Sequence, residues 1–312
     1  MKTNLSSLLG IQYPIIQGAM VWITDANLVA AMANAGATGV IATGGRTTEW
    51  VRAEIRKAKT LTNKPFGVNI MLMSPNKDDI VSVVCEEKVH FVTTGAGDPR
   101  PYINKLHEAG VKIIPVVPSV KLAKRIEAAG ADAIVIEGME GGGHVGTQTT
   151  MALMSNVIPE VTIPVIVAGS IVDGRGIAAA LLMGASGVQM GSRFLLAEEC
   201  ALHQKAKEMI IAATDTDSVV TGYSRGTSVR GIRNAFTDQY LEMERAGVPT
   251  EKLNEFATGT SRISAVNGDI VNGVVQAGEG LNRLTQIEPA ATIVDALMVE
   301  TTHTLERAAQ LL

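Results

Sequence analysis

The sequence of 312 residues has few of the features that mark several common classes of protein. Aromatic residues make up only 4%, and the two cysteines, Cys85 and Cys200, are too few for a disulfide scaffold or a cysteine zinc site. No run of about 18 apolar residues occurs, and the first residues lack the apolar stretch of a signal peptide. We therefore expect a cytoplasmic protein without membrane-spanning segments.

Charge and motifs exclude further classes. The formal net charge is −4, which gives no long-range attraction for nucleic acid or an anionic membrane. The chain has no GxGxxG fingerprint after its first predicted strand, no phosphate loop of the GxxxxGK[ST] type, no HExxH and no GxSxG. The five histidines are scattered, so no metal site is expected: His90, His107, His144, His203 and His303.

What the sequence does have is a regular alternation of strand and helix patterns up to about residue 197. Hydrophobic residues make up 46% of the chain, and short β-branched runs bounded by Gly, Pro or Thr alternate with longer segments of helical period. The predicted strands cover residues 13–18, 38–43, 65–70, 90–95, 112–117, 132–138, 164–169 and 187–191.

Eight such units favour an α/β fold in which the strands close into a TIM (β/α)8 barrel, with an open doubly wound sheet as the alternative. We expect the barrel to span residues 1–199. The alternation stops near residue 200, and residues 200–280 predict a small, mainly helical lid domain over the barrel mouth. Residues 281–312 are amphipathic at helical spacing and are expected to return to the barrel as an outer helix.

Active sites of such barrels lie at the carboxyl ends of the strands. The turns after the seventh and eighth predicted strands read VAGSIVDGRG and QMGSRF. Free backbone N–H groups at such turns, next to a helix N-terminus, bind phosphate groups in many barrels. Gly169, Ser170, Gly191 and Ser192 are therefore candidates for a phosphate site, and the alternative is that these glycines only form tight turns.

One histidine differs from the others in its position. The stretch EGMEGGGHVG, residues 137–146, follows the sixth predicted strand and places His144 at the catalytic face among five glycines. A loop so rich in glycine loses much conformational entropy on folding, so a function is expected of it. His90, His107 and His303 are interpreted as structural or solvent-facing residues.

Seven ordered motifs resemble a known family. IQYPIIQGAM, KPFGVNIMLMSP, VTTGAGDP, IIPVVPSV, AIVIEGMEGGGHVG, PVIVAGSIVDGRG and GVQMGSRF resemble the flavin-dependent enoyl-acyl-carrier-protein reductases of the FabK type and their relatives, the nitronate monooxygenases or 2-nitropropane dioxygenases. The resemblance covers about two thirds of the chain and continues weakly through GTSVRGIRN. GVNIMLMSP, VTTGAGDP and PVVPSV resemble the reductase more than the monooxygenase.

This resemblance implies an oxidoreductase that binds FMN, takes hydride from NADH or NADPH and reduces a trans-2-enoyl thioester in fatty-acid biosynthesis. It implies His144 as the catalytic residue, an acyl carrier protein as the carrier of the substrate, a homodimer and a stimulating monovalent cation. In a nitronate monooxygenase the same histidine serves as a base or as a partner of the bound anion. A non-catalytic flavin-binding or phosphate-binding barrel is the third reading. The implied cofactor-binding residues are Gly18, Ala19, Met20, Asn69, Thr94, Glu137, Gly143, Gly169, Ser170, Gln189, Gly191 and Ser192.

Some residues depart from the family pattern or extend the prediction. Ala19 and Ser170 stand where the reductases usually have glycine, and Glu279 stands where they more often have glutamine. If Glu279 faces the flavin, its carboxylate disfavours the reduced, anionic flavin. Glu140 is expected to be a loop or solvent residue. Three arginines in the lid segment are candidates for docking an acidic carrier protein, with a solvated basic loop as the alternative: Arg225, Arg230 and Arg233.

Overall fold

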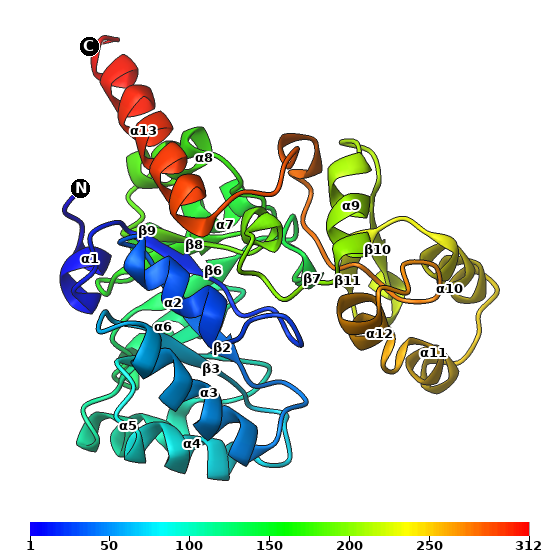
Figure 1. The fold of residues 1–312 in the computed structure, drawn as a ribbon, viewed down its shortest axis with the longest axis horizontal. Coiled ribbons are helices and arrows are strands. Elements are labelled where there is room, and N and C mark those ends of the chain that lie inside the picture. The colour runs from blue at the N-terminus through cyan, green and yellow to red at the C-terminus, as the bar shows by residue number, and fades with distance from the viewer. Residues whose placement is uncertain (312) are drawn as a thin grey trace.

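A computed structural model describes residues 1–311 of the chain. Within these residues, eight parallel strands form a closed barrel and helices cover its outside, so the predicted TIM barrel is confirmed (Figure 1). The strands, in barrel order, are β1 (Ile15–Gln17), β2 (Thr38–Ala42), β3 (Gly67–Met71), β4 (Phe91–Gly95), β5 (Lys112–Val117), β6 (Ile134–Glu137), β8 (Val165–Ala168) and β9 (Gly187–Met190).

The barrel closes because the last strand pairs with the first. Ile16 of β1 lies beside Gln189 of β9 on one side and beside Thr38 of β2 on the other, both in parallel register. The strands are almost wholly buried, since both faces of a barrel strand are covered. Phe91 fills space inside the sheet next to Gly67, where an added Cβ atom would lie 2.6 Å from the Phe91 ring. A glycine is therefore required there for strands β3 and β4 to pair.

Several of the outer helices begin at side chains that accept hydrogen bonds from the free N–H groups of the first turn. Asp25 accepts from Asn27 N at 2.9 Å at the start of α2, and Asp173 accepts from Gly176 N at 2.9 Å at the start of α8. The barrel helices are α1 (Asn4–Leu9), α2 (Ala26–Asn34), α3 (Thr48–Leu61), α4 (Lys77–Glu86), α5 (Ile103–Glu108), α6 (Val120–Ala128), α7 (Thr150–Val157) and α8 (Gly174–Leu182). Short 3-10 turns are η1 (Arg100–Tyr102), η2 (Ile158–Glu160), η3 (Ser192–Leu196), η4 (Tyr223–Arg225) and η5 (Leu281–Arg283).

The lid is mainly helical, as expected, and it also contains a small sheet. It holds α9 (Gln204–Ala212), α10 (Ala235–Arg245), α11 (Thr250–Ala257) and α12 (Thr260–Asn267), together with a three-stranded antiparallel sheet of β10 (Ser218–Thr221), β11 (Val229–Ile232) and β7 (Gly143–His144). Strand β7 comes from the barrel loop that follows β6. Two residues are too few to give an alternating pattern, which is why the sequence did not predict this strand.

The C-terminal helix α13 (Ala290–Ala309) returns to the barrel and packs against α8 and α2 (Figure 1). The packing is close because Gly174 faces α13, where a Cβ atom would lie 2.5 Å from the Leu297 carbonyl oxygen. Glu300 also accepts a hydrogen bond from Gly174 N at 2.8 Å. The connection is fastened by Arg193, whose Nη2 lies 2.5 Å from Glu288 Oε2.

The described part of the chain has neither a membrane-spanning helix nor a cluster of metal-binding side chains. Residues 1–311 contain no helix that is long and apolar enough to cross a membrane. The same residues contain no cluster of three or more His, Cys, Asp or Glu side chains placed to hold a metal ion.

Candidate active site

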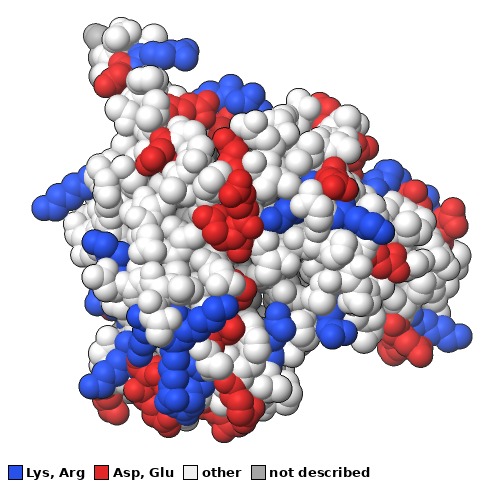
Figure 2. Space-filling view, viewed as in Figure 1, with Lys and Arg blue, Asp and Glu red and all other residues white. Residues whose placement is uncertain are grey.

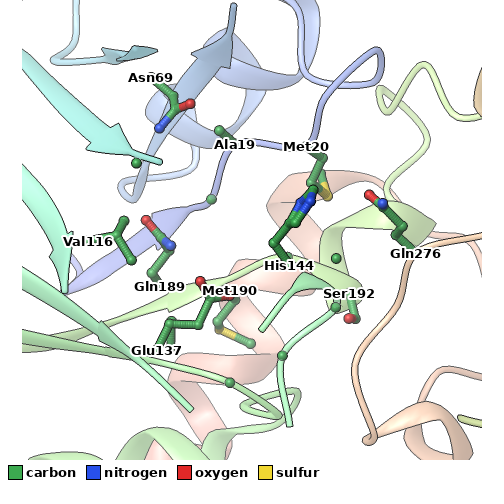
Figure 3. Close-up of a pocket in the computed structure, with 18 of the residues that line it drawn as sticks. Ala19, Met20, Asn69, Val116, Glu137, His144, Gln189, Met190, Ser192 and Gln276 are labelled. Carbon is green, nitrogen blue, oxygen red and sulfur yellow. The ribbon is translucent and has the colours of Figure 1, made fainter. Parts of the chain in front are cut away.

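A cavity of about 560 Å³ opens at the carboxyl ends of the barrel strands, beneath the lid. This volume is within the range of ordinary cofactor and small-molecule pockets. In Figure 3, His144 and Gln276 lie on the lid side, and Ala19, Met20 and Asn69 lie on the barrel side. Charged side chains are few in the lining, so the site can take a large, mostly apolar ring system.

The structure brings almost all of the predicted site residues to this one cavity. Thr94 is the exception. Successive side chains of a strand point to opposite faces, and Thr93 Oγ1 accepts a hydrogen bond from Asn69 Nδ2 at 3.0 Å near the cavity, so Thr94 points away and is buried outside it. The residues of the prediction that line the cavity are Gly18, Ala19, Met20, Asn69, Glu137, Gly143, His144, Gly169, Ser170, Gln189, Gly191 and Ser192.

His144 reaches the cavity because its loop leaves the barrel and joins the lid sheet. Gly143 pairs with Arg230 and His144 pairs with Val229 in the antiparallel ladder of β7 and β11. The imidazole is exposed, and among residues 1–311 neither of its nitrogens has a hydrogen-bond partner. Both nitrogens are therefore free to bind a ligand held between the barrel and the lid.

Arg230 holds the glycine loop in this position. Its guanidinium group is buried and donates to the Met139 carbonyl oxygen at 3.0 Å and to Ser218 Oγ at 2.7 Å, and its Nη1 lies 2.8 Å from Glu279 Oε1. Arg230 is thus unavailable to a docking partner, contrary to its proposed place in a carrier-binding patch. Glu279 faces Arg230 and does not line the cavity, so the expected effect of its carboxylate on a flavin does not arise.

The other residues of the predicted basic patch, and Glu140, also have internal contacts. Arg233 lies 2.6 Å from Asp238, and Arg225 donates to the Val248 carbonyl oxygen at 3.4 Å. Glu140 accepts hydrogen bonds from Thr150 N at 2.8 Å and Thr150 Oγ1 at 2.8 Å at the start of α7. Glu140 is therefore a loop residue, as the first of the two expectations had it, and its carboxylate anchors the end of the glycine loop.

Glu137 is the titratable side chain that the barrel itself contributes to the cavity. Burial raises the pKa of its carboxyl group to about 7, because the strand end of β6 removes water from the carboxylate without supplying a charged partner. Its Oε1 lies against Gly141, where an added Cβ atom would be 2.8 Å away. Near neutral pH this carboxyl group is able both to donate and to accept a hydrogen bond.

The turns after β8 and β9 have the properties of a phosphate site. Gly169 and Ser170 have positive φ angles of 109° and 54°, a conformation that is unusual for the serine. A Cβ atom on Gly169 would lie 2.7 Å from Thr150 Oγ1, so the first position requires glycine. Among residues 1–311, no acceptor bonds the backbone N–H groups of Ser170, Ile171, Ser192 and Arg193.

These free N–H groups, beside a cavity of sufficient volume, fit the phosphate and ring of FMN. Ser192 keeps a hydroxyl hydrogen for such an anion, because its Oγ acts as acceptor for Gly278 N at 2.8 Å. The tight-turn reading of the glycines accounts for Gly169 but leaves the unpaired donors of both turns unexplained.

Several residues of the lining were not predicted. Gln276 comes from the segment that leaves the lid and lies on the same side of the cavity as His144 (Figure 3). Met71, Met73, Val116 and Pro118 give the barrel side of the opening an apolar surface. The methionines and Pro118 follow strand ends, which was a usable signal, whereas Gln276 follows no strand, so only its position in the folded lid brings it to the site.

Comparisons with known proteins agree with this geometry. The family model for nitronate monooxygenase matches residues 2–82 and 74–300. The solved structure of FabK from Thermotoga maritima superposes with a TM-score of 0.96 at 41% identity, covering 100% of both chains. A probable nitronate monooxygenase of Staphylococcus aureus is 32% identical over 95% of this chain and 96% of its own length.

A third kind of relative carries another name. The (3aS,4S,5R,7aS)-5-hydroxy-7a-methyl-1-oxo-octahydro-1H-indene-4-carboxyl-CoA dehydrogenase of Rhodococcus jostii is 36% identical over 91% of this chain and 79% of its own length. The names of these relatives differ in activity, but all of them are names of oxidoreductases or of members of the same fold. The chain therefore belongs to the nitronate monooxygenase family, a family of FMN-dependent oxidoreductases.

Proposed function

We propose that this protein is an FMN-dependent reductase of trans-2-enoyl thioesters that takes its reducing equivalents from NADH or NADPH. The observation that carries the proposal is the position of His144, an unpaired imidazole that faces the cavity from the lid while glycines keep the space beside it open. The likeness to FabK over the whole chain supports the reductase over the other activities of the family.

The residues of the cavity divide the work of this reaction. FMN, when bound, passes to the substrate the hydride that it receives from the nicotinamide. Addition of hydride to Cβ places negative charge on the thioester oxygen, and Cα then needs a proton. His144 is placed to donate a hydrogen bond to that oxygen and, as imidazolium, to give the proton to Cα. The balance is one hydride from NAD(P)H and one proton for each double bond reduced.

The residues expected to hold FMN come from the barrel. The free N–H groups of the turns at Gly169 and Gly191 bind the phosphate, and the loop after β1 and the strand ends at Asn69 and Glu137 contact the ring. Met71, Met73 and Pro118 offer an apolar surface for the acyl chain. We further propose an acyl carrier protein as the source of the thioester and a homodimer as the working state.

Nitronate monooxygenase is the second candidate, because the family model and the Staphylococcus aureus relative carry that name. In that reaction His144 binds the nitronate anion or takes a proton, and O2 is the oxidant. His144 would donate a proton in the reductase and would accept one or bind an anion in the monooxygenase. The assay therefore has to distinguish the two substrates.

Steady-state assays of the purified yellow protein test the proposal. We expect NADH or NADPH to be oxidised at a rate that depends on crotonyl-CoA or a crotonyl carrier protein, with little consumption of O2. Rapid uptake of O2 with propionate 3-nitronate, without oxidation of NAD(P)H by the thioester, would assign the monooxygenase instead. The assay is run in parallel with H144A, in which the flavin content serves as the control for folding.

A further inference from the structure

A cluster of two arginines and two tryptophans lies at the rim of the flavin cavity and takes no part in the site described above. The guanidinium carbon of Arg46 lies 4.6 Å from the centroid of the Trp22 ring and 4.2 Å from that of Trp50. Arg262, from helix α12 of the lid, approaches the same Trp22 ring at 5.4 Å. The barrel and the lid thus each contribute one guanidinium group to a single indole.

The barrel part of the cluster, formed by Trp22 and Arg46, includes a strained backbone conformation. Trp22 has a φ angle of 70°, a left-handed conformation that a bulky residue rarely adopts. Its ring lies against Gly45, where an added Cβ atom would be 2.4 Å away, and its carbonyl oxygen accepts from Arg46 Nη2 at 3.1 Å. Backbone strain that the surroundings maintain is typical of functional sites.

The two guanidinium groups are not neutralised by the protein. No carboxylate among residues 1–311 lies within 4.0 Å of Arg46 or Arg262. The nearest acids, Asp25 and Glu54, bind N–H groups at the start of α2, with Glu54 Oε2 2.8 Å from Ala26 N. Arg46 Nη1 has no partner and reaches solvent, and its buried Nε has no partner either. Arg262 is exposed.

Both guanidinium groups lie over the Trp22 ring, so their positive charges act on each other. Burial lowers the pKa of Arg46, Glu54 opposes this effect, and the positive charge of Arg262 lowers the pKa further. Two like charges held together favour an anion between them, because an anion removes their mutual repulsion. The whole chain carries a net charge of −4, so an anionic ligand needs such a local basic group to be retained.

The cluster is next to the reacting ring site. Trp22 stands between Val21 and Ile23, which line the cavity, and Arg262 follows Ser261, which lines a second, much smaller pocket together with the same two residues. Figure 2 shows Lys and Arg side chains on both sides of the hollow between the barrel and the lid. The two arginines therefore lie beside residues of the cavity wall.

We propose that Arg46 and Arg262 form a phosphate site at the rim of the cavity that binds the phosphorylated adenosine of a co-substrate. The inference rests on the proposed reductase function, in which one form of each co-substrate carries this chemistry. NADPH has a phosphate on its adenosine ribose, and so has coenzyme A, whereas NADH and a carrier-protein thioester do not. Planar guanidinium groups suit phosphate because they donate two parallel hydrogen bonds. Arg46 is the barrel half of the site, and Arg262 is the lid half.

Binding of small probes to the FMN-loaded protein tests the site without turnover. Adenosine 2′,5′-bisphosphate represents the NADPH end and adenosine 3′,5′-bisphosphate the coenzyme A end, and each is titrated by calorimetry at low and high salt. We expect one of the two to bind, roughly tenfold or more weaker binding in R262A, partial recovery in R262K, and weaker binding as salt rises. The identity of the probe that binds tells which co-substrate uses the site.

R245A is the matched control, because Arg245 is an exposed arginine on lid helix α10 and its loss changes the net charge by the same amount. R46Q is the second variant, and its thermal unfolding is recorded because Arg46 also packs on the two indoles. The proposal is overturned if neither probe binds the wild type, or if R262A and R245A bind the probe as the wild type does.

The result is separable from the fate of the proposed function. If a probe binds in an Arg262-dependent way but NAD(P)H does not reduce a thioester, the phosphate site stands and the reductase fails. If the reductase activity is present but the KM values for NADPH, NADH, crotonyl-CoA and crotonyl-pantetheine are the same in R262A and R245A, the site fails and the reductase stands.

Discussion

At the level of single residues, the chemistry of the cavity depends on two titratable side chains that face it from opposite sides. His144 comes from the lid sheet and has both nitrogens free among the described residues, whereas Glu137 ends barrel strand β6. The histidine is exposed, whereas the carboxyl group is partly buried in the cavity wall. Their environments differ, so their roles in proton transfer and in binding are expected to differ too.

Replacement of His144 by alanine is expected to slow turnover by roughly 10²-fold or more, because general acid catalysis contributes about this factor. FMN should remain bound, since His144 reaches the cavity from the lid and not from the phosphate turns. Turnover is measured with a crotonyl thioester, and bound FMN by its visible absorbance. Unchanged turnover in H144A would remove the imidazole from the mechanism.

Glu137 is expected to make stability depend on pH. Its folded pKa of about 7 lies above the usual value of 4.5, so the folded state holds the proton more tightly. Stability from this group is present below pH 4.5 and is lost as pH rises through 7. The full shift corresponds to roughly 3 kcal/mol, and water in the cavity reduces it to the order of 2 kcal/mol.

Denaturant unfolding at pH 5 and pH 8 measures this dependence. E137Q should lose less free energy of unfolding between the two pH values than the wild type, and E242Q, a change at an exposed helix position, should behave as the wild type. An identical pH dependence in E137Q and wild type would show that the carboxyl group is not shielded.

Some of the site residues were predictable from the sequence and others were not. His144, Glu137 and the turn glycines follow strand ends, and the barrel rule alone sends such residues to one face. Gln276 follows no strand, so the barrel rule does not apply to it. Arg230 belongs to a segment with three arginines, for which a solvated basic loop was one of the two interpretations. The pattern of charges does not reveal that Arg230 is buried, because its partners Met139, Ser218 and Glu279 lie far from it in the sequence.

At the level of elements, the glycine loop and the lid sheet act as one unit. The loop leaves β6, pairs with β11 as β7, and is fixed by Arg230 at Met139 and by Glu140 at Thr150. The eight barrel strands were predictable because each is a continuous apolar run between turn residues. The lid sheet was not, because its strands are short and pair across the sequence from a barrel loop to the lid.

Breaking the Arg230 contacts is expected to displace this loop. R230K keeps the charge but cannot bind Met139, Ser218 and Glu279 together, so we expect roughly tenfold lower kcat and a loss of about 1 to 3 kcal/mol in stability from buried acceptors left unpaired. E279Q, which introduces the residue more common in the reductases, keeps an acceptor for Arg230 and should retain most of the activity. Equal kcat in R230K and wild type would argue against a positioning role.

Two glycines of the same loop make a matched pair. At Gly142 a Cβ atom would lie 2.7 Å from the backbone carbon of Ala277, whereas at Gly146 the nearest atom is Pro118 Cβ at 3.7 Å. G142A should therefore push the loop from the segment that carries Gln276 and lower both activity and melting temperature, while G146A should be nearly neutral. Circular dichroism melting and the thioester assay check both, and equal behaviour of the two variants would contradict the close approach.

At the level of the whole molecule, the cavity joins parts of the chain that belong to three segments: the barrel, the lid and the connection back to α13. Ser192 of the barrel binds Gly278 of that connection, and Arg193 binds Glu288 further along it. The composition and the alternation of strand and helix patterns predicted the barrel. They also predicted that this alternation ends near residue 200. The position of the lid over the barrel depends on contacts between distant segments, which no local pattern encodes.

Cofactor binding should stabilise the whole chain through these shared contacts. FMN at about 100 times its Kd is expected to add about 2.7 kcal/mol, a rise of roughly 5 °C in Tm. Riboflavin lacks the phosphate and should give a smaller rise at the same concentration, because the N–H groups of Ser170, Ile171, Ser192 and Arg193 then stay unpaired. Equal shifts with FMN and riboflavin would contradict the phosphate site at these turns.

The most direct test of the proposed reaction is anaerobic stopped-flow spectroscopy of the FMN-loaded protein in two half-reactions. NADH or NADPH should bleach the flavin absorbance, and crotonyl-CoA or a crotonyl carrier protein should then restore it, with the second step roughly 10²-fold slower in H144A. A flavin that NAD(P)H does not bleach, or that is bleached by propionate 3-nitronate and not reoxidised by the thioester, would contradict the reductase assignment.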